Sequence, residues 1–98
     1  MASPRQRASR PAGPPSVACL RAARALIGVS QGELAQMSGV SVGAIARIER
    51  YAADRPLPCK VRTWTLLVGA LESAGVAFIE ENGGGPGVRL RKGGHQDR

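Results

Sequence analysis

The sequence predicts a mainly α-helical fold, a compact bundle of four to five short helices followed by a short C-terminal β-hairpin. Three observations support this prediction. Serines stand directly before three stretches in which apolar residues recur at helical spacing. Glycines follow two of these stretches, where a left-handed residue ends a helix at little cost. After Gly75 the pattern changes to short β-like runs around a glycine-rich turn.

The first two expected helices are marked at both ends. Ser16 can cap a helix over residues 17–27, which the following glycine ends. Ser30 opens a second helix, because Glu33 three residues later completes a capping box, and Gly39 ends this helix. The positions expected to face inward are Leu20, Ala23, Ile27, Leu34 and Ala35.

Two further helices are expected after the second. Ser41 caps a third helix that runs to about residue 50. A polar, proline-containing link over residues 52–60 leads to a fourth helix over residues 61–74. The apolar stripe of that helix consists of Leu67, Ala70, Leu71 and Ala74.

By composition the chain divides into four parts. Residues 1–15 form a basic arm rich in proline and arginine, which cannot bury a core and is expected to be flexible. Residues 16–75 form the helical domain and residues 76–91 the hairpin, while residues 92–98 form a basic tail that is expected to be disordered.

The positive charge is concentrated at the two ends of the chain. The net charge is +7, yet residues 17–82 are nearly balanced, with seven basic residues against six acidic ones. Terminal arms of this kind are typical of proteins that bind a polyanion, and the alternative is that they only keep a small protein soluble. The arginines of the N-terminal arm are Arg5, Arg7 and Arg10.

The composition argues against an enzyme, a metal site and a membrane protein. The one histidine, His95, lies in the tail, and no nucleophile has a base at a sensible spacing. Cys19 and Cys59 are forty residues apart and are expected to be reduced thiols rather than metal ligands. No segment approaches the roughly 18 apolar residues that span a bilayer. We therefore expect a cytoplasmic protein without a cofactor.

The third helix has two different faces. On a helical wheel, Ile45 and Ile48 define the buried side. Guanidinium groups on the opposite side suit phosphate oxygens or the edge of a guanine. The residues on that opposite side are Gly43, Ala46, Arg47 and Arg50. This pattern indicates a helix that packs on one side and presents the other to nucleic acid.

The spacing of these residues resembles the Xre/Cro-like helix-turn-helix family, of the phage-repressor type. The resemblance covers roughly residues 18–75 and implies a λ-repressor-like bundle that binds double-stranded DNA, usually as a homodimer on a two-fold operator. It implies that the second helix lies across the phosphate backbone and the third enters the major groove. The matching positions are Leu20, Arg24 and Ile27, then Ser30-Gln31-x-Glu33-Leu34-Ala35, Gly39-Val40-Ser41 and Ile45-Ala46-Arg47-Ile48-Glu49.

The resemblance also implies roles for individual residues. Arg24 and Glu49 match a pair that forms a salt bridge in relatives, the alternative being two solvated charges. Gln31 is expected to hydrogen-bond a phosphate with the help of the amides at its helix N-terminus. The residues at base-reading positions are Ser41, Val42, Gly43, Ala44 and Arg47. Further phosphate contacts are expected from Arg50, Tyr51, Arg55 and Lys60.

The start of the third helix departs from the family pattern. Relatives often carry polar residues where this chain has Val42-Gly43-Ala44. Valine and alanine can offer a base only apolar contact, to a thymine methyl, and glycine offers only close approach. Arg47 is therefore the best candidate for direct readout. The arm arginines Arg5, Arg7 and Arg10 are expected to add minor-groove or phosphate contacts.

The hairpin is expected to form the dimer interface. A lone two-stranded hairpin is marginal in water, so its edge is expected to pair with that of a second copy. The alternative is a hairpin folded onto its own bundle. The apolar residues assigned to the interface are Phe78, Ile79, Val88 and Leu90.

These features together predict a sequence-specific, double-stranded-DNA-binding transcriptional regulator, a bacterial or phage repressor that acts as a homodimer in the nucleoid. Two alternatives remain at this point. One is an antitoxin with autoregulatory DNA binding, whose protein partner is a toxin; RNA polymerase is another candidate protein partner. The other is a protein- or RNA-interaction module on the same fold, which the apolar start of the third helix motivates.

Overall fold

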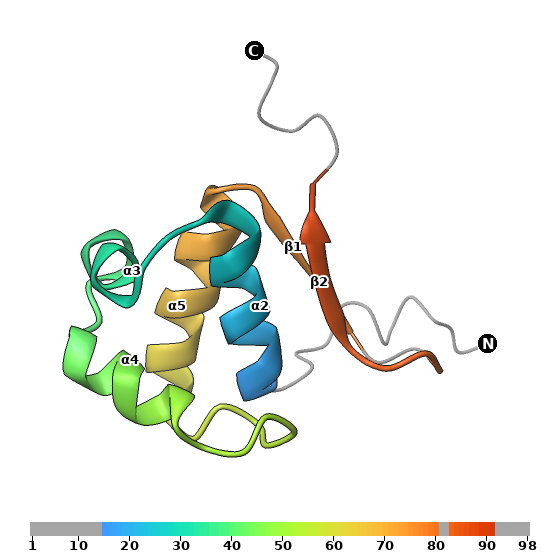
Figure 1. Ribbon diagram of the computed structural model, residues 1–98, viewed down its shortest axis with the longest axis horizontal. Helices are drawn as coiled ribbons and strands as arrows, with labels where there is room; N and C mark the ends of the chain where they lie inside the picture. The colour runs from blue at the N-terminus through green and yellow to red at the C-terminus, as the bar shows by residue number, and fades with distance from the viewer. Residues whose placement is uncertain (1–14, 81–82, 92–98) are drawn as a thin grey trace, which may run out of the picture.

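The computed structural model describes residues 15–80 and 83–91, and it confirms the expected fold class. The described residues form four helices and one antiparallel hairpin (Figure 1). The arm arginines Arg5, Arg7 and Arg10 and the tail over residues 92–98 lie outside the described residues. The elements are α2 (Val17–Ile27), α3 (Gln31–Ser38), α4 (Val42–Glu49), α5 (Val61–Ser73), β1 (Val76–Ile79) and β2 (Gly87–Leu90).

Local sequence signals set the ends of the first three helices. The hydroxyl oxygen of Ser16 accepts the Cys19 N–H at 3.1 Å, and α2 ends at Gly28 with φ 69°. The capping box at α3 is complete: the Glu33 N–H donates to Ser30 Oγ at 3.0 Å, and the Ser30 N–H donates to Glu33 Oε1 at 2.8 Å. These caps satisfy amides that have no partner within the helix.

The core lies where α2 and α5 run side by side, with α3 and α4 on one side of this pair (Figure 1). Most inner positions expected from the sequence are buried, whereas Ala74 is exposed because α5 ends at Ser73. Trp64 is partly buried against this core. The fully buried larger side chains are Leu20, Leu34, Ile45, Ile48, Leu67, Leu71, Val17 and Val76.

The link between α4 and α5 is tied to the start of α2. The Val17 N–H donates to the Arg55 carbonyl at 2.9 Å, and the Leu57 N–H donates to the Pro15 carbonyl at 2.8 Å. Leu57 itself is buried in the core. The residues that follow α4 are therefore held against the bundle, because backbone hydrogen bonds and one apolar side chain anchor them.

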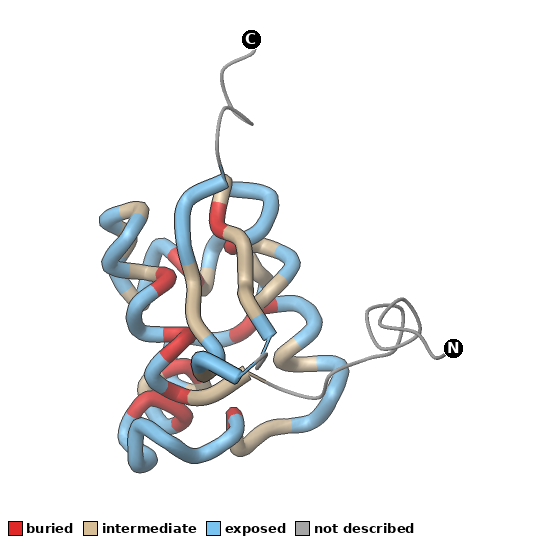
Figure 2. Tube along the Cα trace, turned by 90° about the vertical axis from the view of Figure 1, so that its right-hand side faces the viewer, coloured by how far each residue is buried: buried red, intermediate tan, exposed pale blue. Residues whose placement is uncertain are grey.

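The hairpin packs on its own bundle. It lies on the far side of α2 from α3 and α4 (Figure 1) and runs across the front of the molecule in Figure 2. The register pairs Val76 with Leu90 and Phe78 with Val88, so these four side chains share one face. Val76 is buried, and Phe78 and Val88 pack against the core. The backbone N–H of Arg91 donates to the Gly75 carbonyl at 2.7 Å, which continues the pairing of β1 with β2 at the end of the hairpin away from its turn.

Phe78 and Val88, which are assigned to a dimer interface from the sequence, also pack against the bundle of their own chain. Alternation along the strands turns both side chains to the same side as the buried Val76, and both are partly buried there. Of the other two residues assigned to the interface, Ile79 lies on the opposite face and Leu90 remains about half exposed. The dimer interface itself stays a prediction.

Candidate nucleic-acid interface

A three-residue turn joins α3 to α4 and sets the direction of α4. Gly39 has φ 82°, a left-handed conformation that a residue with a side chain rarely adopts. Val40 is buried, and its N–H donates to Ser38 Oγ at 3.1 Å. Ser41 then caps α4, because its hydroxyl oxygen accepts the Ala44 N–H at 3.1 Å. The turn is therefore anchored both by a side chain in the core and by two serine hydroxyls.

The two faces of α4 are as the wheel predicts. Ile45 and Ile48 are fully buried. Arg47 on α4 and Arg50, the C-cap residue, are both exposed. Gly43 is exposed, and a Cβ built there would meet no atom within 4 Å. Of the other residues assigned to base reading or to the side opposite the isoleucines, Ser41 and Val42 are exposed, while Ala44 and Ala46 are partly buried.

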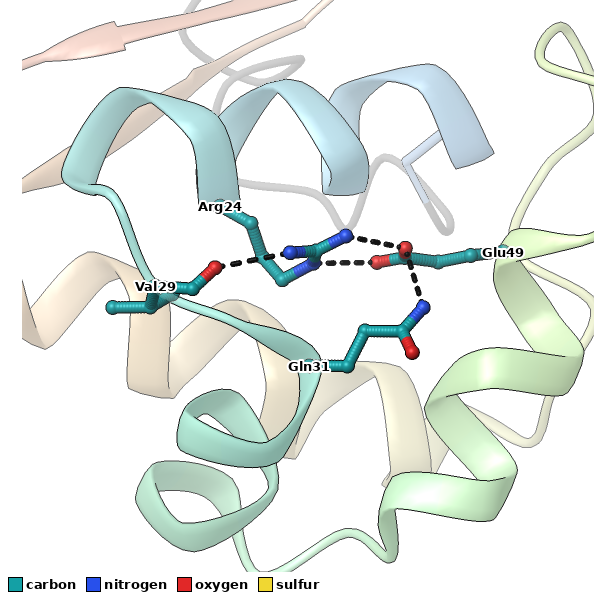
Figure 3. Close-up of polar contacts among 4 residues, drawn as sticks. All are labelled: Arg24, Val29, Gln31 and Glu49. Carbon is teal, nitrogen blue, oxygen red and sulfur yellow. Dashed lines mark hydrogen bonds and ion pairs between the residues drawn. The ribbon is translucent and has the colours of Figure 1, made fainter.

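A network of side chains fixes the C-terminal end of α4 to the start of α3 (Figure 3). The guanidinium of Arg24 forms a bidentate pair with Glu49, at 2.7 Å from Nη2 to Oε1 and 2.9 Å from Nε to Oε2. Arg24 Nη1 also donates to the Val29 carbonyl at 3.0 Å. Gln31 Nε2 donates to Glu49 Oε1 at 3.0 Å. The ion pair expected between Arg24 and Glu49 is thus present and joins α2 to α4, and the bond from Gln31 extends the network to α3.

The network determines the charge state of its members. Burial by itself raises the pKa of Glu49, but hydrogen bonds from Arg24 and Gln31, together with the positive charges of Arg24 and Arg21, more than offset it. The net pKa of Glu49 is lowered. The hydrogen bond to Glu49 is the main cause of the raised pKa of Arg24. Both groups therefore stay ionised, and a charged, bidentate pair is stronger than a neutral hydrogen bond.

Gln31 has a contact that sequence reasoning did not anticipate. Its amide donates to Glu49, so one of its two N–H groups is already used within the chain. The contact holds the Gln31 side chain at the first residue of α3, where the resemblance places a phosphate. The second N–H is the donor left for such a contact. The expected phosphate role and the internal bond are therefore compatible.

The other residues expected to contact phosphate lie in the link after α4, and α2 carries one further basic candidate. Arg55 and Lys60 are exposed, as is Tyr51. The Arg55 carbonyl accepts the Val17 N–H of α2, Lys60 directly precedes α5, and the Tyr51 N–H donates to the Ile48 carbonyl of α4. Arg21 is an additional candidate that the sequence analysis did not single out. It is exposed on α2, and its positive charge lowers the pKa of Glu49, which places it on the same side as the network. Its position one turn before Arg24 is the signal that could have identified it.

Cys59 lies close to Arg47. Burial raises the pKa of the Cys59 thiol, while the positive charge of Arg47 and the backbone amide of Trp64 act in the opposite direction. Cys19 is buried, and both cysteines are free thiols. Over the described ranges, no three His, Cys, Asp or Glu side chains gather as metal ligands would. The helices described here are also too short or too polar for any of them to cross a membrane.

Two short helices joined by a sharp turn, with the second buried on one side and cationic on the other, define a helix-turn-helix protein of the DNA-binding class. Comparison with known families agrees with this geometry: residues 20–56 match the family model described as helix-turn-helix. Residues 20–56 are therefore similar to a helix-turn-helix domain of the Xre/λ-repressor type, which supports a DNA-binding regulator in general. The match spans most of α2, all of α3 and α4, and much of the link. No curated protein matches the chain.

Proposed function

We propose that this protein is a sequence-specific transcriptional regulator, a repressor that binds double-stranded DNA as a homodimer on a two-fold operator. One observation carries the proposal: α4 exposes Arg47 and Arg50 on the side opposite its buried isoleucines. An α-helix fits the major groove of B-DNA, where a guanidinium can bind the O6 and N7 atoms of guanine. Arg47 is the proposed base-reading residue.

In this proposal, α3 docks the domain on the backbone and α4 enters the groove. The amides in the first turn of α3 favour an anion, and Gln31 adds one N–H that is held in place by Glu49. The front of α4 approaches the bases through Ser41, Val42, Gly43 and Ala44. The residues proposed to contact phosphates outside α3 are Arg21, Arg50, Tyr51, Arg55 and Lys60. The arm with Arg5, Arg7 and Arg10 is proposed to add further phosphate or minor-groove contacts.

A second copy of the chain is the proposed protein partner, because a two-fold operator requires a two-fold protein. The surface proposed for the contact is the edge of the hairpin. Leu90 is about half exposed there. The other apolar residues assigned to it are partly buried: Phe78, Ile79 and Val88. A dimer seated on an operator that overlaps a promoter blocks RNA polymerase, and repression follows from this occupancy.

The test of DNA binding is selection of bound sites from a pool of random duplexes, followed by affinity measurements over a range of salt concentrations. We expect one preferred sequence with two-fold symmetry. Arg47→Ala is expected to lose preference at one position of each half-site. Removal of residues 1–14, which keeps the Pro15 carbonyl bound by Leu57, is expected to weaken binding to all sequences and reduce the salt slope. Arg89→Ala is the matched control, since it removes the same charge from β2, on the far side of α2. Equal affinity for the best site and for random duplex refutes a specific regulator.

The dimer requires a separate test, because cutting the chain after Gly75 removes the buried Val76 and disturbs the core. Ile79→Lys combined with Leu90→Lys keeps the packed residues and places charges on the proposed contact. Sedimentation is expected to give a dimer for the unaltered chain and a monomer for this variant. Leu66→Lys, at an exposed leucine on α5, is the control. Dissociation by Leu66→Lys alone places the interface on α5 and contradicts the hairpin assignment.

A further inference from the structure

The first residue of α4 presents an apolar side chain to the space in front of the helix. Val42 is 48% exposed, whereas Val17, which also begins a helix, is fully buried. The residue after Val42 is Gly43, whose Cα has open space around it. A flat surface can therefore approach this end of α4 until it contacts the two methyl groups of Val42.

Few polar groups lie next to Val42 in the sequence, and the hydroxyl oxygen of the preceding Ser41 already accepts a hydrogen bond within the chain. The hydroxyl oxygen of Ser41 accepts the Ala44 N–H at 3.1 Å, so this side chain retains only its O–H as a donor. Gly43 has no side chain and Ala44 is partly buried against the core. The front of α4 consequently offers an apolar surface and one hydroxyl donor, and no amide or guanidinium until Arg47.

Val42 and Arg47 lie at different positions around α4. Five residues separate them, which is a rotation of about 140° and a rise of about 7.5 Å along the axis of an α-helix. The methyl groups of Val42 and the guanidinium of Arg47 therefore reach different parts of any surface that faces α4.

We propose that Val42 is a specificity-determining residue that recognises the C5-methyl group of a thymine, at a base pair other than the one that Arg47 reads. This inference rests on the proposed function and names what its recognition helix binds. Among the base edges in the major groove, thymine alone carries an apolar group, and contact with an aliphatic side chain removes both from water. Each operator half-site therefore contains a thymine whose methyl group is required.

The test replaces each thymine of the selected half-site, one at a time, by deoxyuridine. This change deletes the C5-methyl group and leaves the hydrogen-bonding edge of the base unchanged. At one position we expect the affinity of the unaltered protein to fall about three- to five-fold per half-site, the effect of one buried methyl group. The protein variant Val42→Ala is expected to bind the thymine and deoxyuridine duplexes almost equally well.

Val61→Ala is the matched control, because Val61 is also the first residue of a helix and is 66% exposed. This variant is expected to keep the full preference for thymine. A selected site that binds specifically and tolerates deoxyuridine at every position overturns this inference and leaves the proposed function intact. Loss of the thymine preference in Val61→Ala also overturns it. Absence of any preferred site refutes the proposed function and, with it, the role of Val42.

Discussion

The inner and outer faces of α4 differ in almost every physical respect, although they share eight residues. The inner face contributes Ile45 and Ile48, which are fully buried, and Glu49, which is 9% exposed and bound by Arg24. The outer face contains the exposed Gly43 and Arg47 together with the partly buried Ala46, and Arg47 carries its positive charge. The comparison indicates that stability and DNA recognition are properties of opposite sides of one helix. Substitutions should therefore separate them.

The largest expected effect is on the inner face. Glu49→Ala leaves the Arg24 guanidinium without its carboxylate and Gln31 without its acceptor. Breaking a buried ion pair at one partner costs about 3–5 kcal/mol, which is a large part of the stability of a small domain. Urea denaturation measures the loss. Glu80→Ala, at an exposed carboxylate, is the control. A loss for Glu49→Ala as small as that for Glu80→Ala contradicts the network's role in joining the helices.

The same carboxylate predicts how stability depends on pH. The pKa of Glu49 is lower in the folded state than in the unfolded chain. Its contribution to stability is therefore fully present above the unfolded value, about 4.3, and is lost as the pH falls through the folded pKa. Denaturation curves measured from pH 6 downward should show this loss in the unaltered chain. Glu49→Gln is expected to lack that part of the pH dependence, and an identical pH profile in this variant contradicts the assignment.

The next effect in size is on the outer face. Arg47→Ala is expected to cost about 1–3 kcal/mol of DNA-binding free energy at the preferred site, the value of one bidentate contact with guanine. Its free energy of unfolding should change by no more than about 0.5 kcal/mol, because the side chain is exposed. Fluorescence anisotropy with a labelled duplex and urea denaturation together measure the two quantities. A variant that loses stability in proportion to affinity breaks the separation of the two faces.

The smallest expected effect is a gain. Gly43→Gln places a side chain where a Cβ meets nothing within 4 Å, and it removes a glycine from a helix. We expect the free energy of unfolding to rise by about 0.5–1 kcal/mol. Because an amide can read adenine, the sequence preference of the variant should shift toward adenine at one position. Selection of sites from random duplex measures the shift. Unchanged preference argues that this end of α4 does not face the bases.

The helical part of the molecule was accessible from the sequence because its signals are local. Ser16, Ser30 and Ser41 act as caps within three residues of the groups they bind. The buried side of α4 follows from the helical repeat alone. The pairing of Arg24 with Glu49 joins residues far apart in the chain, and only the family resemblance indicated it.

The contacts that were not foreseen all depend on tertiary packing. The bond from Gln31 to Glu49 requires α3 and α4 to be placed first, and nothing in the local sequence specifies it. The burial of Leu57 follows from the backbone bonds between the link and α2. The apolar residues of the hairpin were recognisable from the sequence, but their composition could not say which of them would meet α2, as Phe78 and Val88 do on the face of Val76.

The most direct test of the central claim is an NMR titration of the 15N-labelled protein with its selected duplex. The account predicts that the largest shifts occur in the amides of residues 41–47 and in the Nε–H signals of Arg47 and Arg50. Arg89, on β2, is expected to remain almost unchanged. Large shifts confined to the hairpin, with the signals of α4 unmoved, would show that DNA binds elsewhere on the molecule.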